Sequence, residues 1–385
     1  MFDFNQILNR QNTKSEKWDT LDNKDSIPFT VADTDFLTAP PIMEAIIKRA
    51  THPILGYTIL DQAFYNSIIN FCQRRYELEL KKKWIFITPG VMVGVGIAIE
   101  AWTKEGDSII IQTPVYTPFY RVIEKNCRKL IKNPLKLIND RYMIDFENLE
   151  QGMKTAKAIL LCNPHNPTGR VYTKDEMEQI VALAEKYSVL IISDEIHSDI
   201  IYSGNQHLTI SNISEYAKAN SITMIAPSKT FNIPGLSTSV AIIPDDKLRY
   251  SFYTKLRALG LHEGNAFGVI ALETAYTDCD PWLDELVIYL EENRDHILSY
   301  LKENLPAVKV SKPEGTFLMW LDFSEYGDHT HIHQTLIKNN VMLVDGLIFG
   351  EEGNGYLRLN IGCPKSVLTE GLNRISKAIK EISHD

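Results

Sequence analysis

Six short apolar runs constrain the fold of this chain more than any other feature. They lie between residues 84 and 244, are rich in Ile and Val, and read WIFIT, DSIIIQ, KAILLC, VLIIS, SITMIA and TSVAIIP. Longer amphipathic stretches, such as KDEMEQIVALAEKY, separate several of them. Runs this short and apolar are typical of strands buried on both faces, which occur in mainly parallel sheets with crossover helices. The sequence therefore predicts an α/β protein built on such a sheet.

The pattern changes after about residue 275. A long helical pattern precedes three strand-like runs, VKVSKP, TFLMWLDF and YLRLNIG, and together they predict a smaller α+β domain. The beginning of the chain has too few apolar residues for a core of its own, so we expect it to pack on this smaller domain. We predict an N-terminal segment at residues 1–45, a large domain at 46–275 and a small domain at 276–385.

Composition excludes several classes of partner. The net charge is -9 and no long basic run is present, which argues against nucleic acid or an anionic membrane surface as the main partner. A stretch of about 18 apolar residues, as a membrane span requires, does not occur. The five cysteines are widely spaced without a C-x-x-C pair. We therefore expect reduced thiols in a cytoplasmic protein.

A ligand should bind at the carboxyl ends of the predicted strands, because open parallel α/β sheets hold their ligands at that edge. Five of the runs are followed by the segments PGVMVG, TPVYTPF, NPHNPTG, DEIHSD and PSKTFN. These bring a glycine turn that opens a helix, Tyr116, Asn166, Asp194 and Lys229 to one edge. Neither G-x-G-x-x-G nor G-x-x-x-x-G-K-[ST] occurs, so dinucleotide and nucleoside triphosphate sites lose their main support.

Most of these features also have a structural explanation when each is taken alone. The free N–H groups of Val91 and Met92 could bind a phosphate, but a plain strand-to-helix turn would have the same sequence. Tyr116 could be a half-buried aromatic, and Asn166 could belong to an Asx-type turn. Lys229 could be a lysine whose stem is buried and whose charge reaches the surface.

Taken together, the residues point to one cofactor. Asp194 follows a buried strand, where a carboxylate needs a cation or hydrogen bonds. A desolvated lysine such as Lys229 has a neutral amine that can form a Schiff base with an aldehyde. A carboxylate can keep a pyridine nitrogen protonated, and a helix N-terminus can bind the phosphate of the same molecule. The set therefore predicts a site for pyridoxal 5'-phosphate.

Four motifs, in a fixed order, carry a resemblance to a known family. They are N-P-x-N-P-T-G at 163–169, D-E-I-H at 194–197, S-K-T-F-N at 228–232 and Y-L-R-L-N at 356–360. Over nearly its whole length the chain resembles the fold-type I pyridoxal-phosphate enzymes, the aminotransferase class I/II superfamily. VADTDF at 31–36 and GTFLMWLDF at 315–323 are similar to one branch, the cystathionine β-lyase or C-S lyase group (MalY/PatB type). The resemblance implies a seven-stranded sheet in the large domain.

The resemblance also implies a role for each candidate residue. Lys229 would bond to the cofactor and then remove the Cα proton of the substrate, and Asp194 would pair with the pyridine nitrogen. Asn166 would donate to the phenolic oxygen and contact substrate, while Tyr116 would stack on the ring. Arg358 would bind the substrate α-carboxylate, which suits a planar bidentate donor.

Phosphate binding is implied for the backbone of Val91 and Met92, with Ser228 as a further contact. Tyr57, in the segment LGYT, matches a tyrosine that in this superfamily reaches the phosphate in the neighbouring subunit. The resemblance thus implies a homodimer in which Tyr57 serves catalysis and substrate binding in the partner's site.

Two departures from the wider aminotransferase pattern bear on the reaction. His197 stands beside the cofactor where many aminotransferases have a tyrosine. Ala226 and Ser237 occupy positions where many relatives have a phosphate-binding serine and arginine. These departures fit the lyase branch.

The implied function is a C-S β-lyase that cleaves L-cystathionine, L-cysteine or related S-substituted cysteines to a thiol, pyruvate and ammonia by α,β-elimination. A class I/II aminotransferase is the alternative, because both reactions begin with removal of the Cα proton. A regulatory or binding protein that merely retains the scaffold is a third class. The presence of Lys229, Asp194, Asn166 and Arg358 together argues against it.

Three histidines at strand spacing, His329, His331 and His333, could place three imidazoles on one face as metal ligands. They follow a Gly-Asp turn and precede a helical pattern. We therefore expect an exposed loop or a helix start there, and we predict no metal site.

Overall fold

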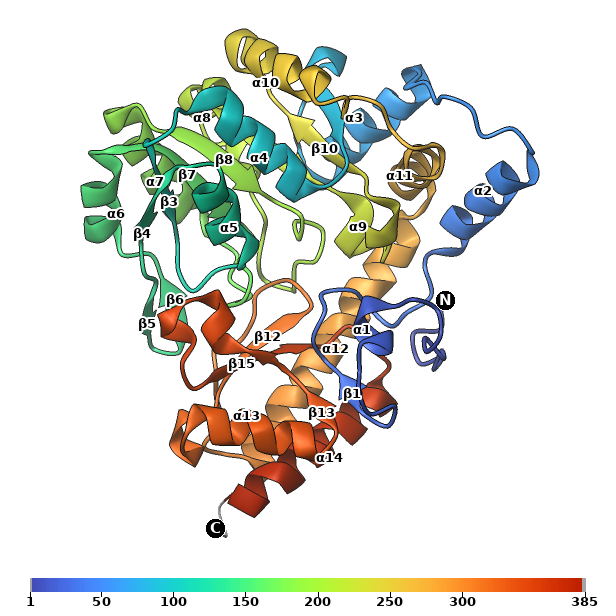
Figure 1. The fold of residues 1–385 in the computed structure, drawn as a ribbon, viewed down its shortest axis with the longest axis vertical. Coiled ribbons are helices and arrows are strands. Elements are labelled where there is room, and N and C mark those ends of the chain that lie inside the picture. Colours follow the sequence, from blue (N-terminus) through green and yellow to red (C-terminus); the bar gives the residue numbers. More distant parts are fainter. Residues whose placement is uncertain (1, 383–385) are drawn as a thin grey trace.

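A seven-stranded sheet forms the centre of the larger half of the computed structural model, which describes residues 2–382 (Figure 1). Its strands, in order across the sheet, are β2 (Ile85–Thr88), β10 (Ser239–Ile242), β9 (Ser221–Ile225), β8 (Leu190–Asp194), β7 (Ala156–Cys162), β3 (Ser108–Ile111) and β4 (Lys129–Lys132). Neighbouring strands are parallel, except that β10 is antiparallel to both β2 and β9. The predicted α/β fold with a mainly parallel seven-stranded sheet is confirmed.

Successive residues of the central strands enter two different hydrophobic cores. In β3, Ile109 and Ile111 pack on one face of the sheet, and Ile110 packs on the other. The first face is covered by α4 (Val91–Trp102), α5 (Pro118–Lys125) and α10 (Asp246–Ala258), and the second by α6 (Phe146–Met153), α7 (Lys174–Tyr187) and α8 (Glu215–Ala219). Because both faces are covered, side chains that point to either face of the sheet must be apolar, which explains the continuous apolar runs in the sequence.

A smaller antiparallel sheet lies below the large one in Figure 1. Its strands, in order, are β11 (Lys309–Val310), β12 (Leu318–Asp322), β15 (Tyr356–Asn360) and β14 (Val344–Asp345). It packs with α12 (Asp280–Asn304), α13 (His329–Lys338) and α14 (Lys365–Ile382). With 25 residues, α12 is the longest helix of the described part, yet no helix within residues 2–382 is long and apolar enough to cross a membrane.

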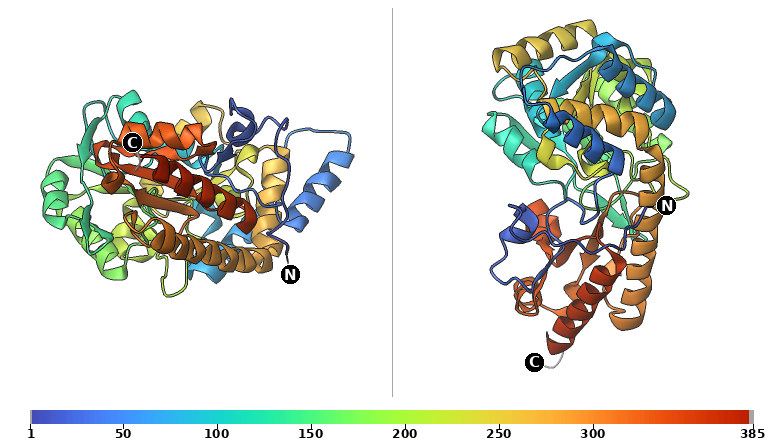
Figure 2. Two further views of the ribbon diagram at one scale, coloured as in Figure 1. Left: turned by 90° about the horizontal axis from the view of Figure 1, so that it is seen from below. Right: turned by 90° about the vertical axis from the view of Figure 1, so that its right-hand side faces the viewer.

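The N-terminal segment packs beside this smaller sheet (Figure 2). β1 (Ile27–Pro28) pairs in parallel with β13 (Val341–Met342), and the carbonyl of Phe29 accepts a hydrogen bond of 3.0 Å from the Asn360 N–H. The Phe29 ring is buried in the same core as α12 and α14. The segment therefore has its core contacts on this side, while the domain boundaries at residues 45 and 275 stay a prediction.

The remaining helices stand at the edge of the large sheet. They are α2 (Pro40–Thr51), α3 (Gln62–Tyr76) and α11 (Ala266–Asp278), and both α2 and α3 pack against α11. The loop of residues 52–61, between α2 and α3, runs along the outer edge of the molecule (Figure 1). The short elements are α1 (Glu16–Asp19), α9 (Pro227–Thr230), β5 (Lys136–Ile138) and β6 (Arg141–Met143).

The packing of Phe29 on α14 generates a stability prediction. A Cβ at Gly371 would overlap the Phe29 ring. Gly→Ala inside a helix normally stabilises by about 0.5–1 kcal/mol, but overpacking a core costs about 1–3 kcal/mol. We expect Gly371→Ala to lower the free energy of unfolding by about 1–2 kcal/mol in denaturant melts of the cofactor-free protein.

Gly96→Ala in α4 is the matched control, because the nearest neighbour of a Cβ there is the Val122 side chain at an ordinary 3.5 Å. This variant should be neutral or stabilised. A Gly371→Ala protein as stable as the Gly96→Ala protein would contradict the tight packing of Phe29.

Candidate active site

The residues predicted to bind the cofactor lie at or just beyond the carboxyl ends of the strands of the large sheet. Tyr116 follows β3, Asn166 follows β7, Asp194 ends β8, and Lys229 follows β9 in the short helix α9. These four strands are neighbours in the order β9-β8-β7-β3. β2, which precedes Val91, is separated from them by β10, but it runs in the same direction as β9 because β10 is antiparallel to both. All five strands therefore present their carboxyl ends at one edge.

The Lys229 amine is held in surroundings that favour its neutral form. Its Nζ donates a hydrogen bond of 2.6 Å to the carbonyl oxygen of Ala32. Burial lowers the pKa of the Lys229 amine to about 8, and the charge of Arg358 adds to this effect, while Asp33 and Asp194 oppose it. A neutral amine is the form that attacks an aldehyde or accepts a proton.

Asp194 is buried at the end of β8, with 4% of its surface exposed. Its Oδ1 accepts a hydrogen bond of 3.1 Å from the Ile196 N–H. Burial raises the pKa of the Asp194 carboxyl to about 7, although this hydrogen bond and the nearby Lys229 charge both favour the carboxylate. A cationic partner brought into contact with Asp194 would stabilise the carboxylate further.

Arg358 joins the site from the smaller sheet. It lies in β15, is 5% exposed, and donates to Asn166 Oδ1 at 3.1 Å and to the carbonyl oxygen of Thr30 at 2.8 Å. Burial lowers the pKa of its guanidinium to about 10. Its Nε is buried without a hydrogen-bond partner among the described residues. The guanidinium therefore has donor capacity left for an anionic group.

Tyr116 and His197 are the two remaining residues predicted to lie beside the cofactor ring. The Tyr116 N–H donates to the Asn166 carbonyl at 3.1 Å, and burial together with the Asp194 charge raises the pKa of the Tyr116 phenol. His197 is 2% exposed, and its ring meets the Phe317 ring edge-on at 5.5 Å. Burial, helped by Lys229, lowers the pKa of His197 to about 3, so its imidazole is neutral at pH 7.

The helix end predicted to bind phosphate is open. α4 begins at Val91, and Gly90 before it has a φ of 146°, a conformation that side chains rarely adopt. The N–H groups of Val91 and Met92 have no acceptor within residues 2–382, as expected for a first helical turn. Ser228, one residue before Lys229, is partly exposed.

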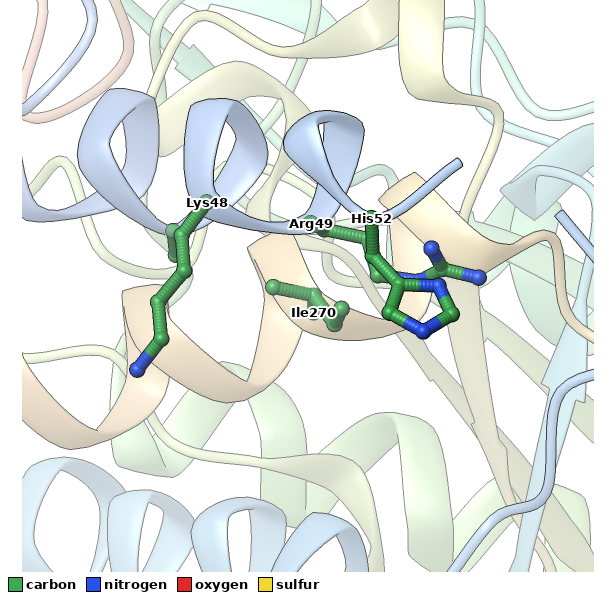
Figure 3. A pocket seen from close by; sticks show the side chains of 5 residues that line it. Lys48, Arg49, His52 and Ile270 are labelled. Carbon is green, nitrogen blue, oxygen red and sulfur yellow. The ribbon is translucent and has the colours of Figure 1, made fainter. Parts of the chain in front are cut away.

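Tyr57 lies outside this group of residues. It belongs to the loop 52–61 at the outer edge of the molecule and is 98% exposed. A pocket near the start of this loop lies between α2 and α11, and Figure 3 shows Lys48, Arg49 and His52 around Ile270 in its wall. None of the predicted site residues lines that pocket.

The N-terminal segment contributes contacts that sequence reasoning missed. Thr30 and Ala32 offer carbonyl oxygens to Arg358 and Lys229. These contacts involve main-chain carbonyls, which every residue has, so the residue types do not reveal them. The motif VADTDF, noted only for its resemblance to a family, was the one available signal.

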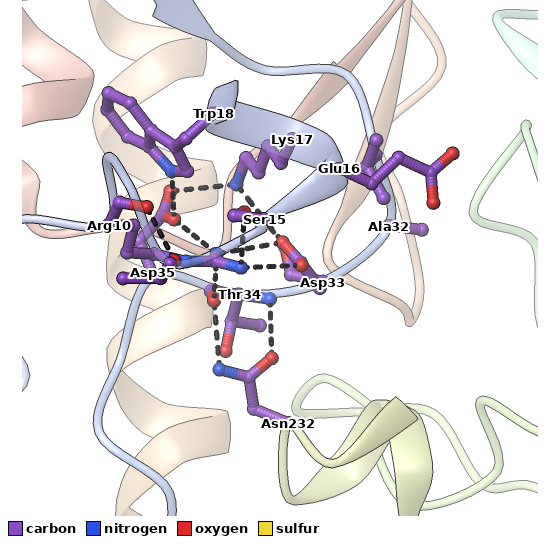
Figure 4. A network of polar contacts seen from close by, with 12 residues as sticks. Arg10, Ser15, Glu16, Lys17, Trp18, Ala32, Asp33, Thr34, Asp35 and Asn232 are labelled. Carbon is purple, nitrogen blue, oxygen red and sulfur yellow. Dashed lines mark hydrogen bonds and ion pairs between the residues drawn. The ribbon is translucent and has the colours of Figure 1, made fainter. Parts of the chain in front are cut away.

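Ion pairs and hydrogen bonds hold this segment in place (Figure 4). Arg10 contacts both carboxylate oxygens of Asp33, at 3.0 and 2.8 Å, and one of Asp35 at 2.7 Å. Lys17, which is 1% exposed, binds Asp35 at 2.7 Å. The Asn232 amide, three residues after Lys229, donates to the carbonyl of Thr34 at 2.9 Å and accepts from its N–H at 3.0 Å. The N-terminal segment is thus hydrogen-bonded to a residue that lies just after Lys229 in the chain.

The three histidines open a helix. His329 begins α13 after the N-cap Asp328, so the expected helix start is present. The His329 ring is buried and lies 2.8 Å from Asp345. His333 Nε2 lies 3.3 Å from the Leu343 carbonyl. Within residues 2–382, no group of three or more potential ligands is placed to hold a metal ion.

The donor set fits pyridoxal 5'-phosphate. Lys229 can bond to an aldehyde, Asp194 can accept from a protonated pyridine nitrogen, and the open N–H groups of Val91 and Met92 suit a phosphate. The Arg358 Nε has no partner among the described residues, so the guanidinium keeps an unused donor for a substrate carboxylate.

Proteins similar to this chain over nearly its whole length include a structure that contains pyridoxal 5'-phosphate. The curated relatives include the cystathionine beta-lyase PatB of Bacillus subtilis, 40% identical over 98% of this chain and 99% of that protein. Protein MalY of Escherichia coli is 33% identical over 99% of this chain and 100% of that protein. The crystal structure of cystalysin from Treponema denticola, which contains a pyridoxal 5'-phosphate cofactor, is 34% identical, covers 99% of both chains and has a TM-score of 0.95.

The family model described as aminotransferase class I and II matches residues 24–375, so it spans most of the chain, including every motif from NPHNPTG to YLRLN. This chain belongs to the aminotransferase class I and II family.

Proposed function

We propose that this protein is a pyridoxal-phosphate-dependent C-S β-lyase that cleaves L-cystathionine, L-cysteine or related S-substituted cysteines. The balanced reaction is R-S-CH2-CH(NH3+)-COO- plus water to R-SH, pyruvate and ammonium. The observation that carries the proposal is the convergence of Lys229, with its lowered pKa, with Asp194 and Arg358 at one sheet edge. The named activity of PatB, a cystathionine beta-lyase, supports the choice of reaction.

The residues divide the work between binding and proton transfer. When bound, pyridoxal phosphate supplies a pyridine ring that accepts electrons from the substrate Cα. Arg358 binds the α-carboxylate, and Asn166 fixes the guanidinium through its Oδ1. Lys229 Nζ removes the Cα proton, which its lowered pKa permits near neutral pH. Asp194, in its buried position, would accept a hydrogen bond from the protonated ring nitrogen of the bound cofactor.

These positions allow the protein to hold both the substrate and the cofactor. Arg358 binds one anionic end of the substrate, and the amides of Val91 and Met92 bind the phosphate at another point. With the substrate carboxylate held by Arg358 and the cofactor held through its phosphate, the Cα–H bond would be directed toward Lys229. With a leaving sulfur on Cβ, loss of the Cα proton leads to loss of the thiol and, after addition of water, to pyruvate and ammonium.

An aminotransferase is the second candidate, because the matching family carries that name and the early steps are shared. The two reactions differ in whether a group leaves from Cβ. A 2-oxo acid acceptor is needed for transamination and not for elimination.

We also propose a homodimer in which Tyr57 reaches the phosphate in the partner's site. The surface around Tyr57 supports this, because Ile47, Ile54, Leu55 and Ile59 are all more than half exposed on α2 and the loop 52–61. Large apolar residues grouped on one surface are typical of an interaction site. Ala226 and Ser237 offer no cation for the phosphate, so a group from a second chain would complete its binding.

The cysteines support a cytoplasmic location. All five are free, and Cys72, Cys162, Cys279 and Cys363 are buried. Burial raises the pKa of each of these four thiols, which makes them poor nucleophiles. Thiols of this kind are typical of a reducing compartment.

Purified protein with L-cystathionine tests the reaction. We expect pyruvate and ammonia in the absence of any 2-oxo acid, and we expect Lys229→Ala to lose activity by roughly a thousandfold, together with the visible absorbance of the bound cofactor. Turnover that depends absolutely on a 2-oxo acid would identify an aminotransferase instead.

The lowered pKa of Lys229 predicts its chemical reactivity in the cofactor-free protein. A folded-state pKa of about 8 means that the neutral amine predominates above that pH. Acylation of Lys229, followed by peptide mass spectrometry, should have its midpoint near this value, whereas ordinary lysines titrate near about 10.4. Asp194→Asn should move the midpoint to lower pH because the opposing charge is removed. A midpoint in the ordinary lysine range would contradict the assigned surroundings.

Mixed dimers test the role of Tyr57. A dimer of one Lys229→Ala chain and one Tyr57→Ala chain has one complete site if Tyr57 acts across the interface. We expect activity on mixing two nearly inactive proteins, measured by pyruvate release. Tyr250→Ala, which removes another tyrosine that is 75% exposed, should remain active by itself. Absence of recovery in a confirmed mixed dimer would rule out action across the interface.

A further inference from the structure

Lys229 lies in a helix that is too short to fix its own position. α9 has four residues, and a single helical turn is unstable by itself because nucleation is unfavourable. Two main-chain bonds stabilise its C-terminal side, from Phe231 to Pro227 at 2.9 Å and from Ile233 to Ser228 at 3.1 Å. These bonds are internal to the segment, so they do not fix the lysine relative to the sheet.

A side-chain bond supplies that connection. Thr230, the residue after Lys229, is fully buried, and its Oγ1 donates to Asp199 Oδ2 at 2.6 Å. An O–H···O distance this short is typical of a hydroxyl bound to an ionised carboxylate. The backbone next to Lys229 is therefore attached to a buried acid that the proposed mechanism does not use.

Asp199 has few partners, which makes each of them important. Its Oδ1 accepts from the Tyr76 hydroxyl, which also lies 2.9 Å from Ser198 Oγ. Asp199 takes part in no ion pair within the described residues. A buried carboxylate held by neutral hydroxyls loses much of its stabilisation if one of them is removed.

The groups facing Asp199 come from several elements. Burial raises the pKa of the Asp199 carboxyl, whereas the bonds from Thr230 and Tyr76 and the charges of Arg75 and His207 favour the carboxylate. Cys72 and Tyr276 also face it, and its charge contributes to their raised pKa values. The groups that interact with Asp199 thus come from α3, α11, the loop that contains His207, and α9.

Asp199 and Asp194 belong to one segment that is held by internal hydrogen bonds. Both lie in DEIHSD, residues 194–199, where the Ser198 N–H donates to the Glu195 carbonyl at 3.0 Å. The N–H of Ile200, the next residue, donates to the His197 carbonyl at 3.0 Å. Glu195 is fixed in turn by Ser193 Oγ at 2.8 Å and by the Ile210 N–H at 3.0 Å. A bond to Asp199 is therefore a bond to the segment that carries Asp194.

We propose that Asp199 is a positioning residue, which acts through Thr230 to hold Lys229 at a fixed distance from Asp194. The inference rests on the proposed function in one respect: Lys229 and Asp194 serve two ends of the same cofactor ring. Their separation must then match the ring, and a displacement of about 1 Å can cost about a hundredfold in rate.

Thr230→Val tests the proposal, because it removes the hydroxyl and keeps the shape. The first measurement is the rate at which cofactor-free protein attaches pyridoxal phosphate to Lys229, trapped with borohydride and quantified by peptide mass spectrometry. We expect this rate to fall roughly tenfold or more, and kcat to fall similarly while KM changes less than about threefold. Thr230→Ser, which retains the hydroxyl, should restore both.

Thr223→Val is the matched control. Thr223 is fully buried in β9, and its hydroxyl has no partner among the described residues, so the same chemical change removes no bond there. It should attach the cofactor at the rate of the unaltered protein. If Thr230→Val does not fold, Asp199→Asn should show the slow attachment instead.

Two results would overturn the proposal. One is unaltered attachment and kcat in Thr230→Val or in its substitute Asp199→Asn, and the other is a Thr230→Ser protein as impaired as Thr230→Val. Attachment is measured without substrate, so a negative lyase assay on the unaltered protein would reject the proposed reaction and leave this test intact.

Discussion

The burial of three charged groups at one sheet edge is the constraint on which the rest of the structure depends. Burial lowers the pKa of Lys229 and of Arg358 and raises that of Asp194, so each group is less stable in its charged form than it would be in water. The surrounding chain compensates with main-chain partners: the carbonyls of Thr30 and Ala32 and the N–H of Ile196. Much of the fold around the edge can be understood as holding those partners in place.

The N-terminal segment is the clearest example of such support. Phe29 anchors it in the core beside α14, and the two carbonyls that follow reach Arg358 and Lys229. Arg10 and Lys17 then pair with Asp33 and Asp35, which follow these carbonyls in the chain. Asn232 connects the segment to the residues just after Lys229. The N-terminal segment, which has little core of its own, thus connects Lys229, beyond the end of the large sheet, with Arg358 in the small sheet.

The large sheet and part of the site could be predicted from the sequence, because buried strands appear as apolar runs that are followed by polar residues. The apolar runs between residues 84 and 244 predicted the large sheet, and the residues after them predicted Tyr116, Asn166, Asp194 and Lys229 at its edge. The direction of β10 could not be predicted, since TSVAIIP records burial and not orientation. The carbonyl contacts of Thr30 and Ala32 could not be predicted either, because every residue has a carbonyl. The prediction for Tyr57 came from the resemblance alone, because the strand pattern marks no residue of the exposed loop 52–61.

The alternation of β15 has a consequence for how such an enzyme can diversify. Leu357 and Leu359 point into the core of the smaller sheet, whereas Arg358, between them, points toward Asn166 and the large sheet. Residues that pack the core and the residue proposed to bind substrate therefore alternate along one strand of five residues. Exchange of Arg358 would therefore change the proposed carboxylate site while Leu357 and Leu359 keep the core packed, so a site for a different group can arise in a folded scaffold.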